Sequence, residues 1–187
     1  MVENALVFAS IVIGLAVSEM LFSLNRMLLA RKQVRWDWLP LLLALIILIY
    51  VVLNWWMLAG TPGRSLTLAA FLPSLVQLIL VFLLGAAALP RQIPPTGVDL
   101  HEHYRERASY IWTLFALNSG WMMIRGGAAL AVSGAGPLQL LDNLILDALV
   151  TGLMIWLIFS RSRRLHVAVV VMLALALTWF WAPRVIR

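Results

Sequence analysis

The chain has 187 residues, of which 63% are apolar and only 12% are charged, and its formal net charge is +6. It contains no cysteine, which excludes disulfides, thiolate metal sites and redox-active dithiols. This composition predicts a single transmembrane domain, residues 1–187, whose basic residues flank apolar stretches and contact lipid headgroups rather than nucleic acid.

Six apolar stretches have the length needed to cross a lipid bilayer. A hydrocarbon layer about 30 Å thick requires about 20 apolar residues in a helix, and backbone polar groups that face lipid must be paired within the helix. The sequence therefore predicts an all-α polytopic membrane bundle of six transmembrane helices. The spans are expected near residues 5–29, 38–59, 67–89, 109–131, 138–160 and 166–182.

The first span carries a carboxylate at depth. Glu19 lies well inside the apolar stretch, where burying its charge costs roughly 2.5–3.5 kcal/mol on insertion scales. We therefore expect Glu19 to face the bundle, water or a cation. Two roles stay open: a structural carboxyl, hydrogen-bonded between helices or reaching toward the interface near Arg26, and the handling of an ion or proton.

The second, third and fourth spans each contain an amide side chain at middling depth, namely Asn54, Gln77 and Asn118. One such amide usually contributes about 0.6 kcal/mol of helix association and nothing more. Several of them on different helices exceed what packing requires, so these amides are candidates for lining a solute route.

The longest connection, residues 90–108, is rich in proline at its start and polar at its end. Asp99 is predicted to cap a helix that lies on the membrane surface before the chain turns inward. Metal sites of the zinc or iron kind need three or four ligands, and only Asp99 and His103 have suitable spacing, so no metal and no cofactor is predicted. The candidate interaction residues of this connection are Asp99, His101, His103, Tyr104 and Arg107.

The fourth and fifth spans carry charges that are candidates for an ion pair. Arg125 lies in the outer third of one span, and Asp142 and Asp147 lie in the next, with Thr151 one turn after Asp147. A short Gly-rich turn joins these spans, so we expect Arg125 to pair with Asp142 or Asp147. The pair would either set the register of the two helices or balance charge along a solute route.

The charges of the connections predict the orientation. With Arg26, the first, third and fifth connections hold ten of the fourteen basic residues, whereas the other side has Arg64, Arg184, Arg187 and Arg125. The positive-inside rule then places both termini outside the cytoplasm. The expected location is the inner (plasma) membrane of a bacterium.

A shift of 93 residues aligns two pairs of short blocks: 21–25 with 114–118, and 90–93 with 183–186. Three spans per half would make the halves antiparallel, as in an inverted-topology 3+3 repeat. Leu-rich helices also match one another by chance, so both interpretations stay open.

Several short motifs within residues 8–115 resemble an uncharacterised family of small bacterial six-span membrane proteins. They are residues 10–16, the pair Trp55 and Trp56, the pair Leu89 and Pro90, and the pattern of Asp99 and Leu100 followed by His103, Tyr104 and Arg107. The resemblance implies the architecture and a bacterial origin, and it carries no activity.

Polarity at bilayer depth predicts a channel or transporter for an ion or small solute, formed as a homo-oligomer because six short spans enclose little polar volume. The predicted pathway residues are Glu19, Asn54, Gln77, Asn118, Arg125, Asp142, Asp147 and Thr151. The alternative is a membrane subunit or sensor that presents the 90–108 connection to a partner protein. The sequence leans against an enzyme, because no serine or threonine in the spans has a histidine at activating spacing.

Overall fold

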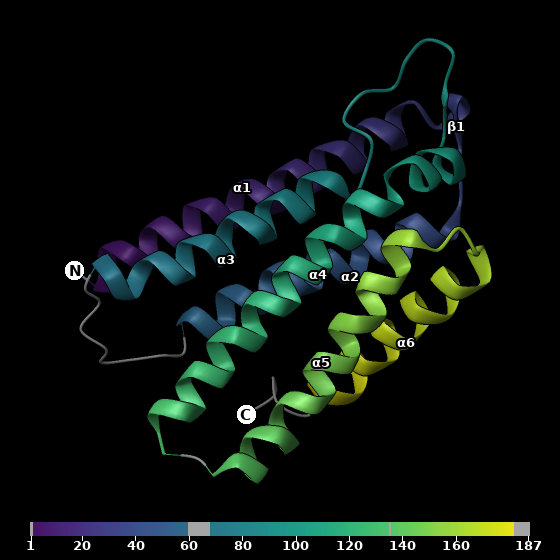
Figure 1. Cartoon of the computed structure of the whole chain (residues 1–187). Helices are drawn as coiled ribbons and strands as arrows, with labels where there is room; N and C mark the ends of the chain where they lie inside the picture. Colours follow the sequence, from purple (N-terminus) through teal and green to yellow (C-terminus); the bar gives the residue numbers. More distant parts are fainter. Residues whose placement is uncertain (1, 60–67, 135, 182–187) are drawn as a thin grey trace.

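The computed structural model describes residues 2–59, 68–134 and 136–181, and within them the fold is all-helical, as predicted. Its six helices, shown in Figure 1, are α1 (Val2–Leu29), α2 (Trp38–Ala59), α3 (Leu68–Ala87), α4 (Leu100–Val132), α5 (Pro137–Phe159) and α6 (Arg163–Trp181). Five of them begin and end within three residues of the expected spans. The length of each apolar run was therefore sufficient to locate these helices.

The fourth helix differs from the expectation. Residues 100–108 are the first turns of α4 itself, so the predicted separate helix on the membrane surface is wrong. No proline or glycine interrupts the sequence between Leu100 and Asn118, so nothing breaks the backbone hydrogen bonds. Asp99 does cap the helix, because its Oδ1 accepts hydrogen bonds from the backbone N–H groups of His101 at 2.9 Å and Glu102 at 3.4 Å.

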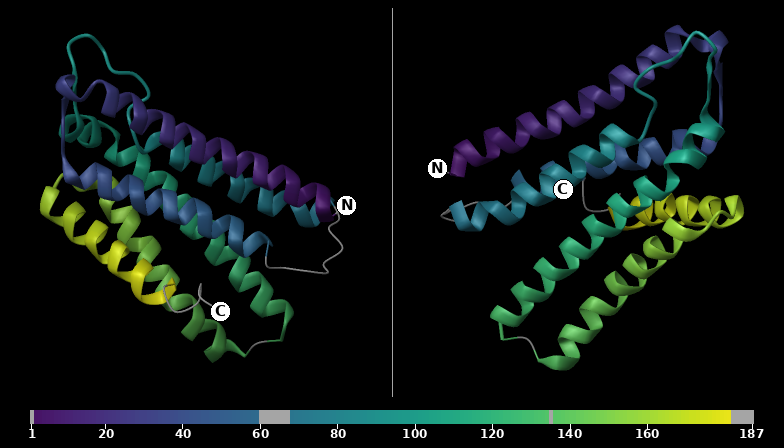
Figure 2. Two further views of the ribbon diagram at one scale, coloured as in Figure 1. Left: turned by 180° about the vertical axis from the view of Figure 1, so that it is seen from behind. Right: turned by 45° about the horizontal axis from the view of Figure 1, so that its top comes forward.

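The helices form a bundle with α4 near its middle. α1 lies along α3, both contact α2, and α4 lies between α3 and α5 (Figures 1 and 2). α6 packs mainly on α2, and the α4–α5 hairpin diverges from the α1–α3 pair in the right-hand view of Figure 2. The two halves therefore pack differently among the described residues, and the 3+3 repeat stays one of two open interpretations.

Three connections, those between α1 and α2, between α3 and α4, and between α5 and α6, meet at one end of the bundle. A short parallel pair joins β1 (Val34–Arg35) to β2 (Val98–Asp99), with Val34 opposite Val98 and Arg35 opposite Asp99. The C-terminus of α1 and the N-termini of α2, α4 and α6 reach the same region (Figure 1). We call this region the polar end and define it as residues 30–37, 88–101 and 160–164.

Apolar side chains form both the core and much of the outer surface. Leu43, Ile47, Leu84 and Trp112 are almost fully buried at the helix contacts. Large apolar side chains are also prominent on the outer surface. A chain that folds in water rarely exposes so much apolar surface. They include Leu15, Phe22, Val52, Ile79, Ile124, Leu149, Trp156 and Leu175.

Among the described residues, two helical windows are long and apolar enough to cross a membrane: Leu6–Leu29 and Trp38–Met57. Only 28% and 44% of these windows are buried, unlike the core helix of a soluble protein, which is mostly buried. Phe71–Ala87 and Leu144–Phe159 are apolar but shorter. The structure thus supports association with a membrane.

Candidate functional site

Three of the predicted pathway amides meet in one cluster between α2, α3 and α4. The Nε2 of Gln77 donates to the Oδ1 of Asn118 at 2.6 Å and lies 3.3 Å from the Oδ1 of Asn54. Gln77 and Asn118 are buried, and Asn54 is half-buried. Amides from three separate helices thus share one hydrogen-bonded site.

A phenol that the sequence analysis missed stands at the centre of this site. The Nδ2 of Asn118 donates to the hydroxyl oxygen of Tyr50, and the Nε2 of Gln77 lies 3.5 Å from the same oxygen. The Tyr50 hydroxyl lies 3.4 Å from the Sδ of Met122, and the Nδ2 of Asn54 donates to the Tyr50 carbonyl at 2.8 Å. The signal was present, because Tyr50 precedes Asn54 by one helical turn and shares its face.

One acceptor of the cluster is unused. The Oε1 of Gln77 is buried and accepts no hydrogen bond from the described residues, which costs about 1–3 kcal/mol. Turning the amide over would place Oε1 against the Oδ1 atoms of Asn118 and Asn54, which are acceptors as assigned. The cluster therefore offers an amide oxygen to a hydrogen-bond donor or a cation, in otherwise apolar surroundings.

Thr151 connects α5 to α4 through Ser119, the residue that follows Asn118 in sequence. Its Oγ1 is 2.7 Å from the Oγ of Ser119 and donates to the Asp147 carbonyl at 2.7 Å. The carboxylate of Asp147, by contrast, is exposed on α5. Of this predicted pair of pathway residues, only Thr151 faces the bundle.

The predicted ion pair between Arg125 and Asp147 is not formed, and both side chains are exposed. The rotation of α4 explains this. A β-carbon on Gly127 would lie 3.3 Å from the Cδ1 of Leu144, so Gly127 faces α5. Residues two apart in a helix differ by about 200°, which turns Arg125 away from α5. The side chain of Asp142 lies outside the described residues.

Glu19 belongs to a different site. Its Oε1 accepts a hydrogen bond from the Nε of Arg91 at 2.8 Å, and its side chain is 29% exposed. Arg26, the neighbour suggested by the sequence, instead donates from Nη1 to the Arg91 carbonyl at 2.7 Å. These contacts attach the 88–101 segment to α1, and they place Glu19 outside the amide cluster.

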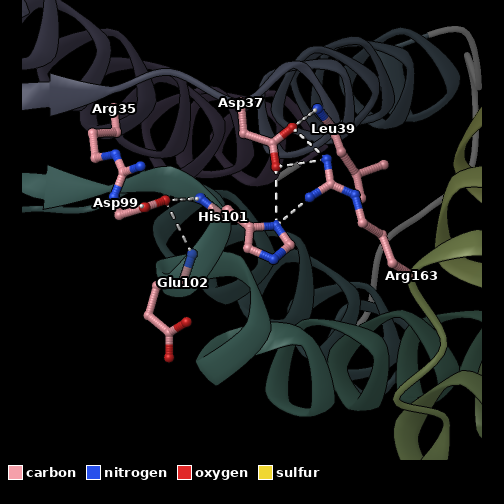
Figure 3. A network of polar contacts seen from close by, with 7 residues as sticks. All are labelled: Arg35, Asp37, Leu39, Asp99, His101, Glu102 and Arg163. Carbon is pink, nitrogen blue, oxygen red and sulfur yellow. Dashed lines mark hydrogen bonds and ion pairs between the residues drawn. The ribbon is translucent and has the colours of Figure 1, made fainter.

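Figure 3 shows the network that joins three helices at the polar end. Asp37 lies just before α2, and only 8% of its side chain is exposed. Its carboxylate contacts the Nη2 of Arg163 on α6 at 2.9 Å and the Nδ1 of His101 on α4 at 3.2 Å, and it accepts the backbone N–H of Leu39 at 3.2 Å. Arg163 also contacts His101 directly. A single buried carboxylate thus holds α2, α4 and α6 together.

A second buried network links α4 to α6. The hydroxyl of Tyr104 donates to the Nδ1 of His166 at 2.7 Å, and the Nε1 of Trp112 lies 3.1 Å from both partners. The Nε2 of His166 donates to the Ser160 carbonyl at 3.0 Å, which makes Nδ1 the acceptor. Burial raises the pKa of Tyr104 to about 12, against a smaller opposing effect of the Trp112 hydrogen bond. Tyr104 is therefore neutral and structural.

The predicted interaction residues divide into two groups. The side chains of Asp99, His101 and Tyr104 are each engaged in contacts with other residues of the protein, and Asp99 also contacts the Nη1 of Arg35 at 3.3 Å. Arg107 is exposed, whereas His103 is half-buried and its Nε2 has no hydrogen-bond partner among the described residues. Burial, and then the charge of Arg107, lower the pKa of His103, opposed by Glu106.

Comparisons of the chain with protein-family models, with curated protein sequences and with solved structures found no match. Function is therefore inferred from two arrangements in the fold. One is the buried amide cluster of Asn54, Gln77 and Asn118 around Tyr50. The other is the polar end, where ion pairs hold the connections in place.

Proposed function

We propose that this protein is a bacterial inner-membrane protein with six spans that passes a small cation or polar solute through its bundle. The observation that carries the proposal is the buried Oε1 of Gln77, which has no hydrogen-bond partner among the described residues although Gln77 belongs to a cluster built from three helices. Amide and hydroxyl oxygens are the ligands that hard cations prefer. Water, ammonium or a small alcohol could donate to the same oxygen.

Three features support the six-span arrangement. Every helix exposes large apolar side chains to the outside. The shortest helix, α6, has 19 residues, and at about 1.5 Å per residue it approaches the thickness of the hydrocarbon layer. The nine basic residues of the first, third and fifth connections gather toward the polar end, and Arg26 makes ten. The positive-inside rule then favours a cytoplasmic polar end and termini outside the cytoplasm.

The protein is proposed to act as a homo-oligomer. Asp147 is exposed on the apolar outer face of α5, where a carboxylate in lipid costs roughly 2.5–3.5 kcal/mol. Contact with a second copy would remove that cost. Arg125 is exposed on α4 of the same hairpin. Within this proposal, Arg125 and Asp147 act at the interface between copies, and the amides act within each copy.

The test is ion flux into liposomes that contain the purified protein, measured for potassium, sodium, protons and chloride. Gln77→Met keeps the volume of the side chain and removes the unused oxygen. Gln92→Met changes an exposed amide at the polar end and serves as the matched control. We expect a cation flux that Gln77→Met lowers about tenfold and Gln92→Met leaves unchanged. A folded wild type that passes none of the four ions would overturn the proposal.

A second candidate, a membrane subunit or sensor, is favoured by the rigid attachment of the 90–108 connection. Asp99, His101 and Tyr104 fix this segment from inside, which leaves Arg105, Glu106 and Arg107 exposed on a well-supported surface. If the protein is a subunit or sensor, substitution of the exposed residues abolishes its activity in the cell. Glu19→Gln and Asp147→Asn then leave that activity unchanged. The opposite result would support the solute pathway.

A further inference from the structure

A cavity of about 400 Å³ opens where α3 ends and α4 begins. Its volume is within the range of small-ligand sites. One wall is apolar and comes from the last turns of α3, including Phe82 and Leu83. The polar part of the lining is formed by Arg91, His103, Arg107 and Tyr110. The lining therefore combines apolar side chains with two guanidinium groups.

The polar wall is positioned by both local and distant contacts. His103, Arg107 and Tyr110 are spaced by four and three residues, which places them on one face of α4. Arg91 comes from the 88–101 segment and is held at its carbonyl by Arg26 and at its Nε by Glu19. Within the described part of the chain, neither Nη of Arg91 makes a hydrogen bond. The Arg91 guanidinium is therefore fixed in position before a ligand binds.

The charge balance of the cavity is positive. Arg91 and Arg107 line it directly, and the nearby carboxylates are Glu19, which pairs with Arg91, and Glu106, which is exposed. The His103 imidazole lines the cavity, and its Nε2 has no hydrogen-bond partner among the described residues. Two cations and an unused imidazole nitrogen together are a site for an oxyanion such as phosphate.

We propose that this cavity binds an anionic phospholipid, with its phosphate between Arg91, His103 and Arg107 and an acyl chain along Phe82 and Leu83. The apolar part of the lining favours a lipid over a free anion. Its apolar wall continues the apolar surface of α3, and its polar wall begins where α3 ends. The exposed Trp36 belongs to the polar end, and the exposed Trp38 is the first residue of α2 beside it, where headgroups would lie.

This inference rests on the membrane location in the proposed function, and it is independent of conduction. The test is binding of dioctanoyl phosphatidylglycerol to the full chain in a nonionic detergent, followed by native mass spectrometry. Dioctanoyl phosphatidylcholine and inorganic phosphate are the comparison ligands. Arg107→Gln removes a cation of the cavity, and Arg105→Gln removes an exposed cation two residues away that pairs with Glu102. Arg107→Lys keeps the charge and controls for loss of folding.

We expect phosphatidylglycerol to bind about tenfold more tightly than phosphatidylcholine, and Arg107→Gln to lose that preference while Arg105→Gln retains it. Arg107→Lys is expected to bind with intermediate affinity. Equal binding of the two lipids, or equal effects of the two glutamine variants, would overturn the proposal. Inorganic phosphate that binds as tightly as the lipid would also overturn it, in favour of a soluble anion. None of these results depends on whether ions pass the amide cluster that contains Gln77.

Discussion

A β-carbon added to Gly97 would lie 2.5 Å from the carbonyl oxygen of Gln33, far inside van der Waals contact. Gly97 also has a φ of +86°, a conformation that side chains rarely adopt. Its backbone N–H donates to the Pro94 carbonyl at 2.9 Å, which closes a tight turn. This close approach brings β2 beside β1 and places Asp99 next to Arg35.

Gly97→Ala should therefore destabilise the polar end. The conformational strain alone costs about 1–2 kcal/mol, and the clash with the Gln33 carbonyl adds to it. The check is thermal unfolding of the purified variant in detergent. Gly14→Ala is the control, because a β-carbon there meets nothing within 4 Å and alanine favours a helix. Equal melting temperatures for the wild type and Gly97→Ala would contradict the prediction.

Asp37→Asn should lower the free energy of unfolding by about 1–3 kcal/mol, because it leaves Arg163 and His101 without their buried carboxylate. A double-mutant cycle with Arg163→Gln measures the pair itself, and the second substitution should cost less in the Asp37→Asn background. Glu102→Gln breaks only the exposed pair with Arg105 and should cost below about 1 kcal/mol. Strictly additive losses would show that Asp37 and Arg163 do not stabilise each other.

The stability of the protein should fall at high pH because of Tyr104. Burial raises the pKa of this phenol from its ordinary 10.0 to about 12 in the folded chain. Between these two values the phenol ionises only after unfolding, so the stability is fully present below pH 10.0 and is lost as pH rises toward about 12. The check is the absorbance of tyrosinate during a pH titration. Tyr104→Phe should remove the ionisation step that occurs at the highest pH, and Tyr110→Phe should leave that step in place.

Binding of an anionic phospholipid should strengthen as pH falls. The pKa of His103 is lowered in the free protein by burial and by Arg107, against the opposing charge of Glu106. A bound phosphate beside Nε2 would raise that pKa again, whereas Arg91 and Glu19 largely offset each other. The measurement is the dissociation constant of dioctanoyl phosphatidylglycerol at about pH 7.5 and about pH 5.5. His103→Gln should flatten the pH dependence, and an unchanged dependence would assign it to another group.

Features that depend on neighbouring residues were predictable from the sequence. The helix bounds of α2 and α5 follow from apolar run length, and Asp99 caps α4 because capping is a local hydrogen bond. The prediction of a separate surface helix was wrong. Polarity changes along α4, but no residue at that change breaks the helix. Composition alone does not end a helix whose backbone hydrogen bonds can continue.

Features that depend on helix rotation were not predictable. Arg125 was expected to face α5, but the contact of Gly127 with Leu144 turns it outward. In one interpretation of the sequence, Glu19 reached toward Arg26, about two helical turns further along the same span. It instead binds Arg91 from the distant 88–101 segment. The expected and the observed arrangements are both compatible with the same apolar, helical sequence. The pattern of residues therefore does not distinguish between them.

The sequence by itself determined an all-helical chain, the positions of its apolar helices and the gathering of basic residues in alternate connections. Each of these depends on composition within a few turns of helix. Only the tertiary structure decided which polar groups meet: Gln77 with Asn118, Asp37 with Arg163, and Tyr104 with His166. These partners are far apart in sequence, and a hydrogen bond between them requires both helices to have the right rotation and depth, which packing of the whole bundle sets.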